Sequence, residues 1–196
     1  MDSKPIVIAS RKDTESRRLA NAADLDGLVS NSWNVSLVTL GIMTFLSQLH
    51  VMADAKVLVG VSGSDLVSLL FMPFKAAVIE ILPLVLGTPV FCPELANQAR
   101  NSGKVHRPYY SPYNATLFED AETGEPIQAR PIHQAKLVTV HVPSMVAHIQ
   151  GAVQLSDAVM FYGLSVHIGT GGRMITCGYD HPAPKGLLYG CTGVRC

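Results

Sequence analysis

The run of residues 56–61, Lys-Val-Leu-Val-Gly-Val, constrains the fold of this chain more than any other stretch. Its continuous apolar character is typical of a strand that is buried on both faces of a parallel sheet. A turn of small residues, 62–64, follows, and residues 65–71 then carry apolar side chains at helical spacing until Pro73 stops the helix. A strand, a short turn and a helix form the repeating unit of α/β proteins. The stretch therefore predicts one such unit.

The same alternation extends along most of the chain. Apolar runs bounded by turn residues predict strands, and apolar residues spaced three and four apart predict helices. Strands are expected at 5–10, 34–40, 56–61, 76–81 and 136–142, and helices at 15–29, 42–52, 65–71 and from 143 onward. This order indicates the α/β class, with a Rossmann-like parallel sheet and flanking helices.

One domain is expected at residues 1–160, because the alternation of strands and helices ends there and a chain of 196 residues can bury one sizeable core. Residues 100–131 are rich in Pro, Tyr, Asn and Arg and predict a loop excursion within this domain. Residues 161–196 are rich in Gly and Cys without any period, and we expect this tail to be poorly ordered.

Charge and hydropathy exclude several classes of function. Lys plus Arg equals Asp plus Glu at 15 each, so no overall field favours nucleic acid or a lipid surface as the main partner. The most lipid-like stretch, 66–92, contains Lys75, Glu80 and several prolines, which predict a buried helix and strand rather than a membrane span. The first apolar run is too short for a signal peptide, so no targeting segment is expected in this chain.

The cysteines and the sequons carry less information. Four cysteines are present without a Cys-x-x-Cys pair, so their spacing predicts no zinc site, and we expect no bound metal. Asn34 and Asn114 begin N-glycosylation sequons, which permit a secretory lumen without requiring one.

The turn at 60–65 is the main candidate site. A helix N-terminus beyond the carboxyl end of a parallel strand offers unpaired N–H groups to an anion, and Gly63 lets the backbone approach a ligand closely. The dinucleotide fingerprint and the lysine of a P-loop are both absent, so a plain connection is an alternative.

A second alternative for the turn is a serine hydrolase. Residues 60–64 match four of the five positions of a nucleophile elbow, with a strand before and a helix after, although the last glycine of the motif is replaced by Ser64. Ser62 would then be the nucleophile. Its base would be His167 or His181, oriented by Asp120 or Asp157.

The order of several motifs resembles glycosyltransferase family 61. Residues 48–66, QLHVMADAKVLVGVSGSDL, are followed by LLFMP at 69–73 and AVIEILP at 77–83. The corresponding family stretch runs Gln-x-x-x-Met, an Ala-Asp-linked strand, Gly-x-His-Gly-Ala-Gly-Leu, Leu-Phe-x-Pro and Val-x-Glu-x-x-Pro. Upstream, residues 6–21 are similar to the family's strand with Arg-Lys and an Arg-Arg-x-x-Asn. The resemblance covers roughly residues 5–160.

The resemblance implies an inverting transferase that moves a sugar from a nucleotide-sugar donor to a protein or glycan acceptor. It also implies two Rossmann-like domains that face a cleft, the GT-B type, of which this chain would be the C-terminal, donor-binding half. The implied partners are the donor and a glycan or glycoprotein acceptor, and a membrane is reached only through an anchor outside this chain. The implied location is the lumen of the Golgi or endoplasmic reticulum. No cofactor is expected, and a divalent cation is possible without being required.

The resemblance assigns particular residues to the donor. Its phosphates would be bound by Arg11, Lys12, Arg17, Arg18, Ser62, Gly63, Ser64 and Asp65. Guanidinium groups match phosphate oxygens bidentately, and the backbone amides at a helix start add further donors. Glu80 would contact a ribose hydroxyl, with a purely structural partner as the alternative. The resemblance assigns no catalytic base.

This chain departs from the family pattern at the turn itself. Residues 62–65 read Ser-Gly-Ser-Asp where the family has His-Gly-Ala-Gly. A carboxylate at a helix start is a good cap, but at about 5 Å from a phosphate, with an effective dielectric near about 20, Asp65 would repel it by about 3 kcal/mol. An alternative is therefore a non-catalytic, glycosyltransferase-like interaction domain that no longer binds the donor.

Overall fold

The computed structural model describes residues 5–11, 16–89, 93–120, 123–126 and 135–162. Five strands form a parallel sheet in the order β3-β1-β4-β5-β7, and the short β6 pairs antiparallel with the end of β5. These strands are β1 (Ile6–Ala9), β3 (Val35–Val38), β4 (Val57–Val61), β5 (Ala77–Val85), β6 (Thr88–Pro89) and β7 (Val105–Asn114).

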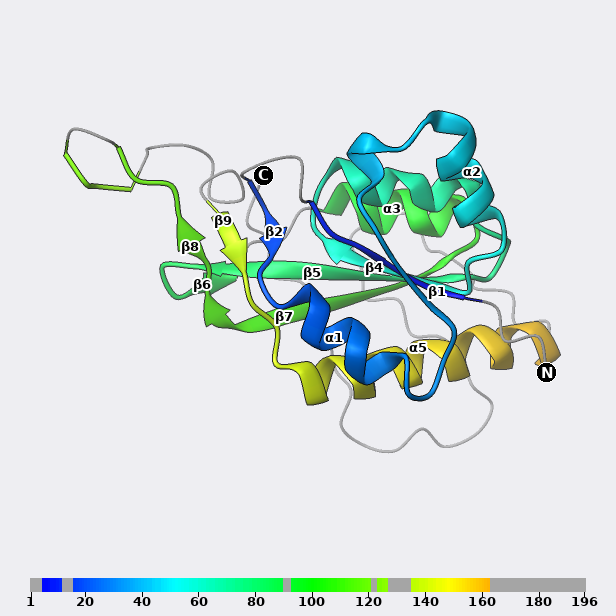
Figure 1. Ribbon diagram of the computed structural model, residues 1–196. Helices are drawn as coiled ribbons and strands as arrows, with labels where there is room; N and C mark the ends of the chain where they lie inside the picture. The colour runs from blue at the N-terminus through cyan, green and yellow to red at the C-terminus, as the bar shows by residue number, and fades with distance from the viewer. Residues whose placement is uncertain (1–4, 12–15, 90–92, 121–122, 127–134, 163–196) are drawn as a thin grey trace, which may run out of the picture.

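Helices cover both faces of this sheet (Figure 1). The helices are α1 (Ala22–Val29) and α5 (Val142–Tyr162) on one face, and α2 (Phe45–Ala53), the 3-10 helix η2 (Ser64–Phe71) and α3 (Pro93–Asn101) on the other. The predicted α/β class, with a Rossmann-like parallel sheet and flanking helices, is confirmed.

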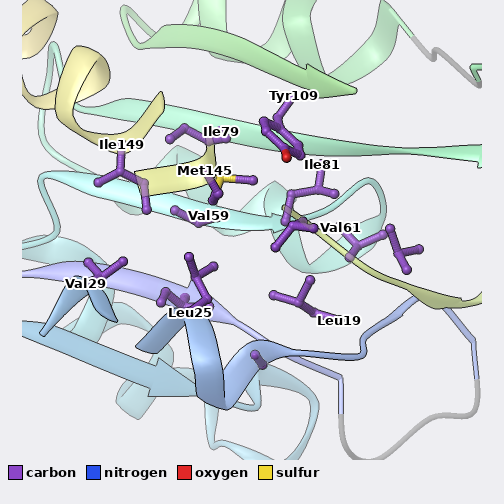
Figure 2. Close-up of a cluster of buried hydrophobic side chains, with 14 of the residues drawn as sticks. Leu19, Leu25, Val29, Val59, Val61, Ile79, Ile81, Tyr109, Met145 and Ile149 are labelled. Atoms are coloured by element: carbon purple, nitrogen blue, oxygen red, sulfur yellow. The ribbon is translucent and has the colours of Figure 1, made fainter. Parts of the chain in front are cut away.

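Side chains of the central strands alternate between the two layers, which explains why β1 and β4 are continuously apolar. Ile8 packs with the layer of α1 and α5, whereas Val7 packs with the layer of α2, η2 and α3. Figure 2 shows the first layer, where Leu25 of α1 and Ile149 of α5 pack over the sheet around Val59. All five of these side chains are fully buried.

A second, three-stranded sheet lies beside the first (Figure 1). It consists of β2 (Arg18–Leu19), β8 (Thr116–Leu117) and β9 (Ala135–Val138), with β2 parallel and β8 antiparallel to β9. Asn21 links the start of α1 to the segment before α5, because its amide nitrogen donates to the Val140 carbonyl at 2.9 Å and its oxygen accepts from the Val140 N–H at 3.2 Å. The helix predicted at 15–29 therefore begins only at Ala22.

The loop excursion predicted at 100–131 differs from the structure. Residues 105–114 form the ten-residue β7, which pairs with β5, and Tyr109 is buried within it. Pro108 and Pro112 suggested a loop, but among the described strands β7 has a partner on one side only, and prolines are tolerated on such an edge strand.

The helix predicted at 42–52 is shorter than expected. Ile42 belongs to a 3-10 turn, η1 (Leu40–Ile42), and α2 begins after Thr44, whose hydroxyl accepts from the Ser47 N–H at 3.2 Å. The apolar spacing predicted one buried face, but Phe45 is 62% exposed and only the end of α2 reaches the core, through Met52. The first turn of α2 instead contacts η2, where the rings of Phe45 and Phe71 lie edge to face.

Within the described part of the chain, no helix is both long enough and apolar enough to span a bilayer. The lipid-like stretch 66–92 contains most of η2, the buried strand β5, and β6. The tail expected at 161–196 lies outside the described residues, except for its first two residues, which end α5.

Candidate functional site

The candidate site lies at the carboxyl ends of β1 and β4, two neighbouring strands of the parallel sheet. Arg11 comes two residues after β1, and residues 62–65 follow β4 directly and begin η2. Ligands of open α/β sheets bind at this edge, because loops from adjacent strands meet there. The predicted location of the site therefore agrees with the topology.

Arg11 and Asp65 form the centre of the site. The guanidinium donates from Nε to Oδ2 of Asp65 at 2.9 Å and from Nη2 to Oδ1 at 2.9 Å, and Nη2 also donates to the Ser64 hydroxyl at 2.6 Å. The two side chains of the ion pair are only 9% and 19% exposed. A guanidinium binds a phosphate through the same two-bonded geometry. The Arg11 guanidinium thus presents the geometry that binds an anion, but its donors are already bound to the carboxylate of Asp65.

A second guanidinium, that of Arg17, approaches the same turn. A Cβ placed on Gly63 would lie 2.8 Å from Nη1 of Arg17 and 3.2 Å from Nη2 of Arg11. Gly63 has a φ of +154°, a conformation that is strained for any other residue, so the backbone requires glycine here. A side chain would also displace the two guanidinium groups. The two arginines therefore converge on the backbone of one glycine.

Arg17 is less well satisfied than Arg11. Its Nη1 donates to the Ser62 carbonyl at 3.3 Å, and its Nε is buried with no hydrogen-bond partner among the described residues. Burial, followed by the positive charge of Arg11, lowers the pKa of Arg17, while Asp65 opposes this shift. Its backbone is also strained, with a φ of +55°. The side chains of Arg11, Arg17 and Asp65 comprise two guanidinium groups and one carboxylate, so together they carry one net positive charge.

A hydrogen-bonded chain links Ser62 of the turn to Glu80 of β5 and His106 of β7. The Ser62 hydroxyl donates to Oε1 of Glu80 at 2.5 Å, and Oε2 of Glu80 lies 2.8 Å from Nε2 of His106. Glu80 is fully buried and Ser62 is 3% exposed. Both carboxylate oxygens of Glu80 are engaged by protein groups, and its predicted ribose contact stays a prediction.

The structure brings together most of the residues that the sequence assigned to the donor phosphates. Arg11, Arg17 and residues 62–65 form one cluster, whereas Arg18 lies on β2 with an exposed side chain and outside these hydrogen bonds. Lys12 lies outside the described residues. The sequence did not predict His106, because it falls in the stretch interpreted as a loop and its approach to Glu80 depends on the pairing of β5 with β7.

The geometry does not favour the serine hydrolase. The Ser62 hydroxyl donates to a buried carboxylate, and among the described residues no imidazole lies within hydrogen-bond reach of it. Asp157 pairs with Lys56 at 2.6 Å, and Asp120 accepts from the Thr123 N–H in a turn. The proposed bases His167 and His181 lie outside the described residues.

One pocket lies outside the arginine cluster, which is the group formed by Arg11, Arg17 and residues 62–65. A pocket of about 520 Å³ is lined by Asn21, Tyr113 and residues 139–143, and it shares no residue with the cluster. The described residues contain no group of three His, Cys, Asp or Glu side chains that could hold a metal ion.

The fold and the cluster define an α/β protein in which two arginines converge on one turn at the carboxyl edge of the sheet. A family model described as Glycosyltransferase 61 matches residues 1–79, a stretch that includes Arg11, Arg17 and the whole turn. The predicted resemblance to this family is confirmed. Glu80 and His106 lie beyond the matched stretch.

A curated relative and two solved structures are also similar to this chain. The relative is "Protein O-linked-mannose beta-1,4-N-acetylglucosaminyltransferase 2" of Takifugu rubripes, 31% identical over 128 residues, which cover 62% of this chain and 21% of the relative. The chain thus spans about a fifth of the length of that relative.

The solved structures are a diflavin flavoprotein A3 from Nostoc sp. and a flavodoxin-like domain from a Synechococcus sp. protein. The first is 16% identical with a TM-score of 0.45, over 82% of this chain and 96% of that chain. The second is 15% identical with a TM-score of 0.44, over 79% of this chain and 98% of that chain.

Proposed function

We propose that this chain is the donor-binding part of a glycosyltransferase and that the arginine cluster receives the diphosphate of a nucleotide sugar. The observation that carries the proposal is the convergence of Arg11 and Arg17 on Gly63, at the carboxyl edge of the sheet. This convergence falls inside the stretch that matches the Glycosyltransferase 61 model.

The cluster fits the chemistry of sugar transfer by direct displacement. An acceptor hydroxyl attacks the anomeric carbon and gives up its proton to a general base, for which no residue is assigned. The bond from that carbon to the diphosphate oxygen breaks, and the electron pair leaves with the diphosphate. Negative charge therefore develops on the leaving group, and guanidinium groups held in place stabilise it. Among the described residues, the Arg17 side chain donates one long hydrogen bond, from Nη1 to the Ser62 carbonyl at 3.3 Å, so it can take an anion without first losing a strong bond.

Arg11 requires a rearrangement before it can contribute. Its two bonds to Asp65 must be exchanged for bonds to phosphate, and the displaced carboxylate must move away from the new anion. If Asp65 stays about 5 Å from the phosphate, the repulsion of about 3 kcal/mol weakens binding by roughly a hundredfold. Donor affinity is therefore low unless the pair opens.

The same ion pair favours a second candidate function. In a non-catalytic, glycosyltransferase-like interaction domain, Asp65 would act as a permanent internal counterion, and the diphosphate site would stay closed. The two-bonded geometry and the partial burial of the pair support this candidate.

Calorimetry on the full chain separates the two candidates. Nucleoside diphosphates and nucleotide sugars are titrated with and without Mn²⁺ into the wild type, Arg17→Ala and, as a matched loss of one positive charge, Arg100→Ala at the end of α3. The donor-binding proposal expects binding to the wild type that weakens by about tenfold or more in Arg17→Ala and is retained in Arg100→Ala. An equal effect of the two variants would contradict the proposed site.

The variant Asp65→Asn completes the test. Binding only after this substitution supports the interaction domain, because the site is then intact but closed by its own carboxylate. If neither the folded wild type nor Asp65→Asn binds any diphosphate, the donor-binding proposal is overturned.

The relative's name describes transfer to O-linked mannose of a protein, and by analogy we propose a glycan or glycoprotein acceptor for this chain. The lumen of the Golgi or endoplasmic reticulum is the corresponding location. Protease protection of a tagged full-length protein in microsomes tests it, and digestion without detergent would contradict it.

A further inference from the structure

We infer that His106 is a positioning residue for the donor turn at 62–65. It holds Glu80, and Glu80 holds Ser62, from which the turn begins. The inference rests on the proposed function, because the turn matters as a place for a diphosphate. His106 itself has no hydrogen bond to the arginine cluster and would act only through Glu80.

The pairing of the strands brings these side chains together. Glu80 of β5 lies opposite Gly60 of β4, so Ser62 is its diagonal neighbour on one side. His106 of β7 lies opposite Val78, which makes it the diagonal neighbour of Glu80 on the other side. Diagonal residues of adjacent strands lie on one face of the sheet and within reach of long side chains. The network therefore runs from the turn after β4 across β5 to β7.

The burial of Glu80 makes both of its partners necessary. Its side chain is 0% exposed and that of His106 is 11% exposed, so water has little access to the carboxylate. A buried carboxylate is stable only if hydrogen bonds satisfy its oxygens. The Ser62 hydroxyl satisfies one oxygen, and a proton on Nε2 lets His106 satisfy the other. Loss of the imidazole donor would leave Oε2 unpaired, and the carboxylate would have to move to find another donor.

Movement of Glu80 would reach the arginine cluster through Ser62. The Ser62 N–H donates to the Ile81 carbonyl at 2.9 Å, its hydroxyl donates to Glu80, and its carbonyl accepts from Arg17 at 3.3 Å. The next residue is Gly63, on which the two guanidinium groups converge. The hydroxyl and the carbonyl belong to the same residue, so a shift of the Ser62 side chain changes the position of the carbonyl to which Arg17 donates.

The test compares three variants of the full chain. His106→Phe keeps a ring and removes the donor, and His106→Gln keeps an N–H that can reach a carboxylate. His50→Phe makes the same chemical change at an exposed position of α2. One readout is the affinity for inorganic pyrophosphate, and the other is the backbone amide NMR shifts of Gly63 and Ser64, which require no ligand.

We expect His106→Phe to weaken pyrophosphate binding by about tenfold and to shift both amides, with His106→Gln within about twofold of the wild type and His50→Phe unchanged. If His106→Phe does not fold, His106→Asn, which is polar but too short to reach Glu80, replaces it. Wild-type binding with unchanged affinity and unchanged amides in His106→Phe would overturn the inference and leave the proposed function intact.

If the wild type does not bind pyrophosphate, the titrations of nucleoside diphosphates and nucleotide sugars into the wild type and Asp65→Asn still decide the proposed function, and the amide shifts alone decide the role of His106. Shifted Gly63 and Ser64 amides, restored in His106→Gln, would then support the positioning role. Unshifted amides would overturn it.

Discussion

Arg11 and Asp65, which are 54 residues apart in the chain, form a two-bonded fork in which Nε and Nη2 of the guanidinium each lie 2.9 Å from a different carboxylate oxygen. The fork ties the loop after β1 to the start of η2. It also places a fixed negative charge where a phosphate group would meet Arg11. The link between the two segments and the fixed negative charge both come from Asp65. A substitution of Asp65 affects both, and measurements of stability and of affinity distinguish the two effects.

The variant Asp65→Asn should bind diphosphates more tightly than the wild type, because it removes a charge that repels phosphate. We expect a gain of about tenfold to a hundredfold at low salt, and a loss of stability of about 1 kcal/mol from the broken ion pair. Calorimetry with nucleoside diphosphates and urea unfolding measure the two effects. Asp54→Asn, at the end of α2, is the matched control, and an affinity unchanged by Asp65→Asn would contradict the assigned role.

The variant Gly63→Ala should disturb the cluster directly. The added Cβ would lie 2.8 Å from Nη1 of Arg17, and the φ of +154° disfavours any side chain. We expect a loss of about 1–3 kcal/mol in the free energy of unfolding, together with weaker diphosphate binding. Gly27→Ala is the control, because nothing lies within 4 Å of its Cβ position in α1, and there we expect a gain of about 0.5–1 kcal/mol. Equal effects of the two substitutions would refute the argument.

The link between α1 and the segment before α5 depends on Asn21. Its side chain makes two hydrogen bonds to the backbone of Val140, and Asn21→Ala leaves both backbone groups without that partner. We expect the free energy of unfolding to fall by about 1–3 kcal/mol, measured by urea denaturation. Asn97→Ala, at an exposed position of α3, should change it by less than about 0.5 kcal/mol. A similar loss in both variants would mean that the Val140 contacts contribute little.

His148 should make stability depend on pH. Its ring lies edge-on to Tyr109, and its Nε2 is buried without a hydrogen-bond partner among the described residues. Burial, and next the charge of Arg107, lowers the pKa of His148 below its ordinary value of 6.5. Below about pH 6.5 the unfolded chain therefore binds a proton more readily than the folded chain, so stability falls as the pH decreases through this range.

The variant His148→Phe tests this dependence, because it keeps the ring contact and removes the titrating nitrogen. We expect its free energy of unfolding to decline less steeply between pH 6.5 and the acid range, by up to about 1.4 kcal/mol per pH unit. Chemical denaturation at a series of pH values measures this slope. The exposed His50→Phe should leave the slope unchanged, and a wild-type slope in His148→Phe would count against the assignment.

The sequence was most informative where structure is determined locally. β1 and β4 were predicted because strands buried on both faces are continuously apolar, and β5 was predicted from an apolar run that only Glu80 interrupts. β7 was not predicted, because its prolines are tolerated only through its place at the sheet edge, which depends on tertiary structure. The exposure of Phe45 and Leu46 on α2 could not be predicted either, because their spacing indicates a helix but does not show what covers it.

The same distinction holds for the candidate site. The position of the turn followed from a strand and a helix that are adjacent in sequence, so residues 62–65 could be predicted. The fork between Arg11 and Asp65 and the contact between Glu80 and His106 depend on how distant strands pair. No local pattern encodes such pairings. The position of the turn was therefore predicted, whereas the side-chain contacts around it were not.

The prolines of β7 bear on self-association. A strand at the end of a sheet offers unpaired N–H and C=O groups to strands of other molecules, and proline removes the N–H. With Pro108 and Pro112 in β7, this end of the five-stranded sheet is a poor template for strand addition. Among the described strands, intermolecular pairing of this sheet is therefore more favourable at β3, at the opposite end.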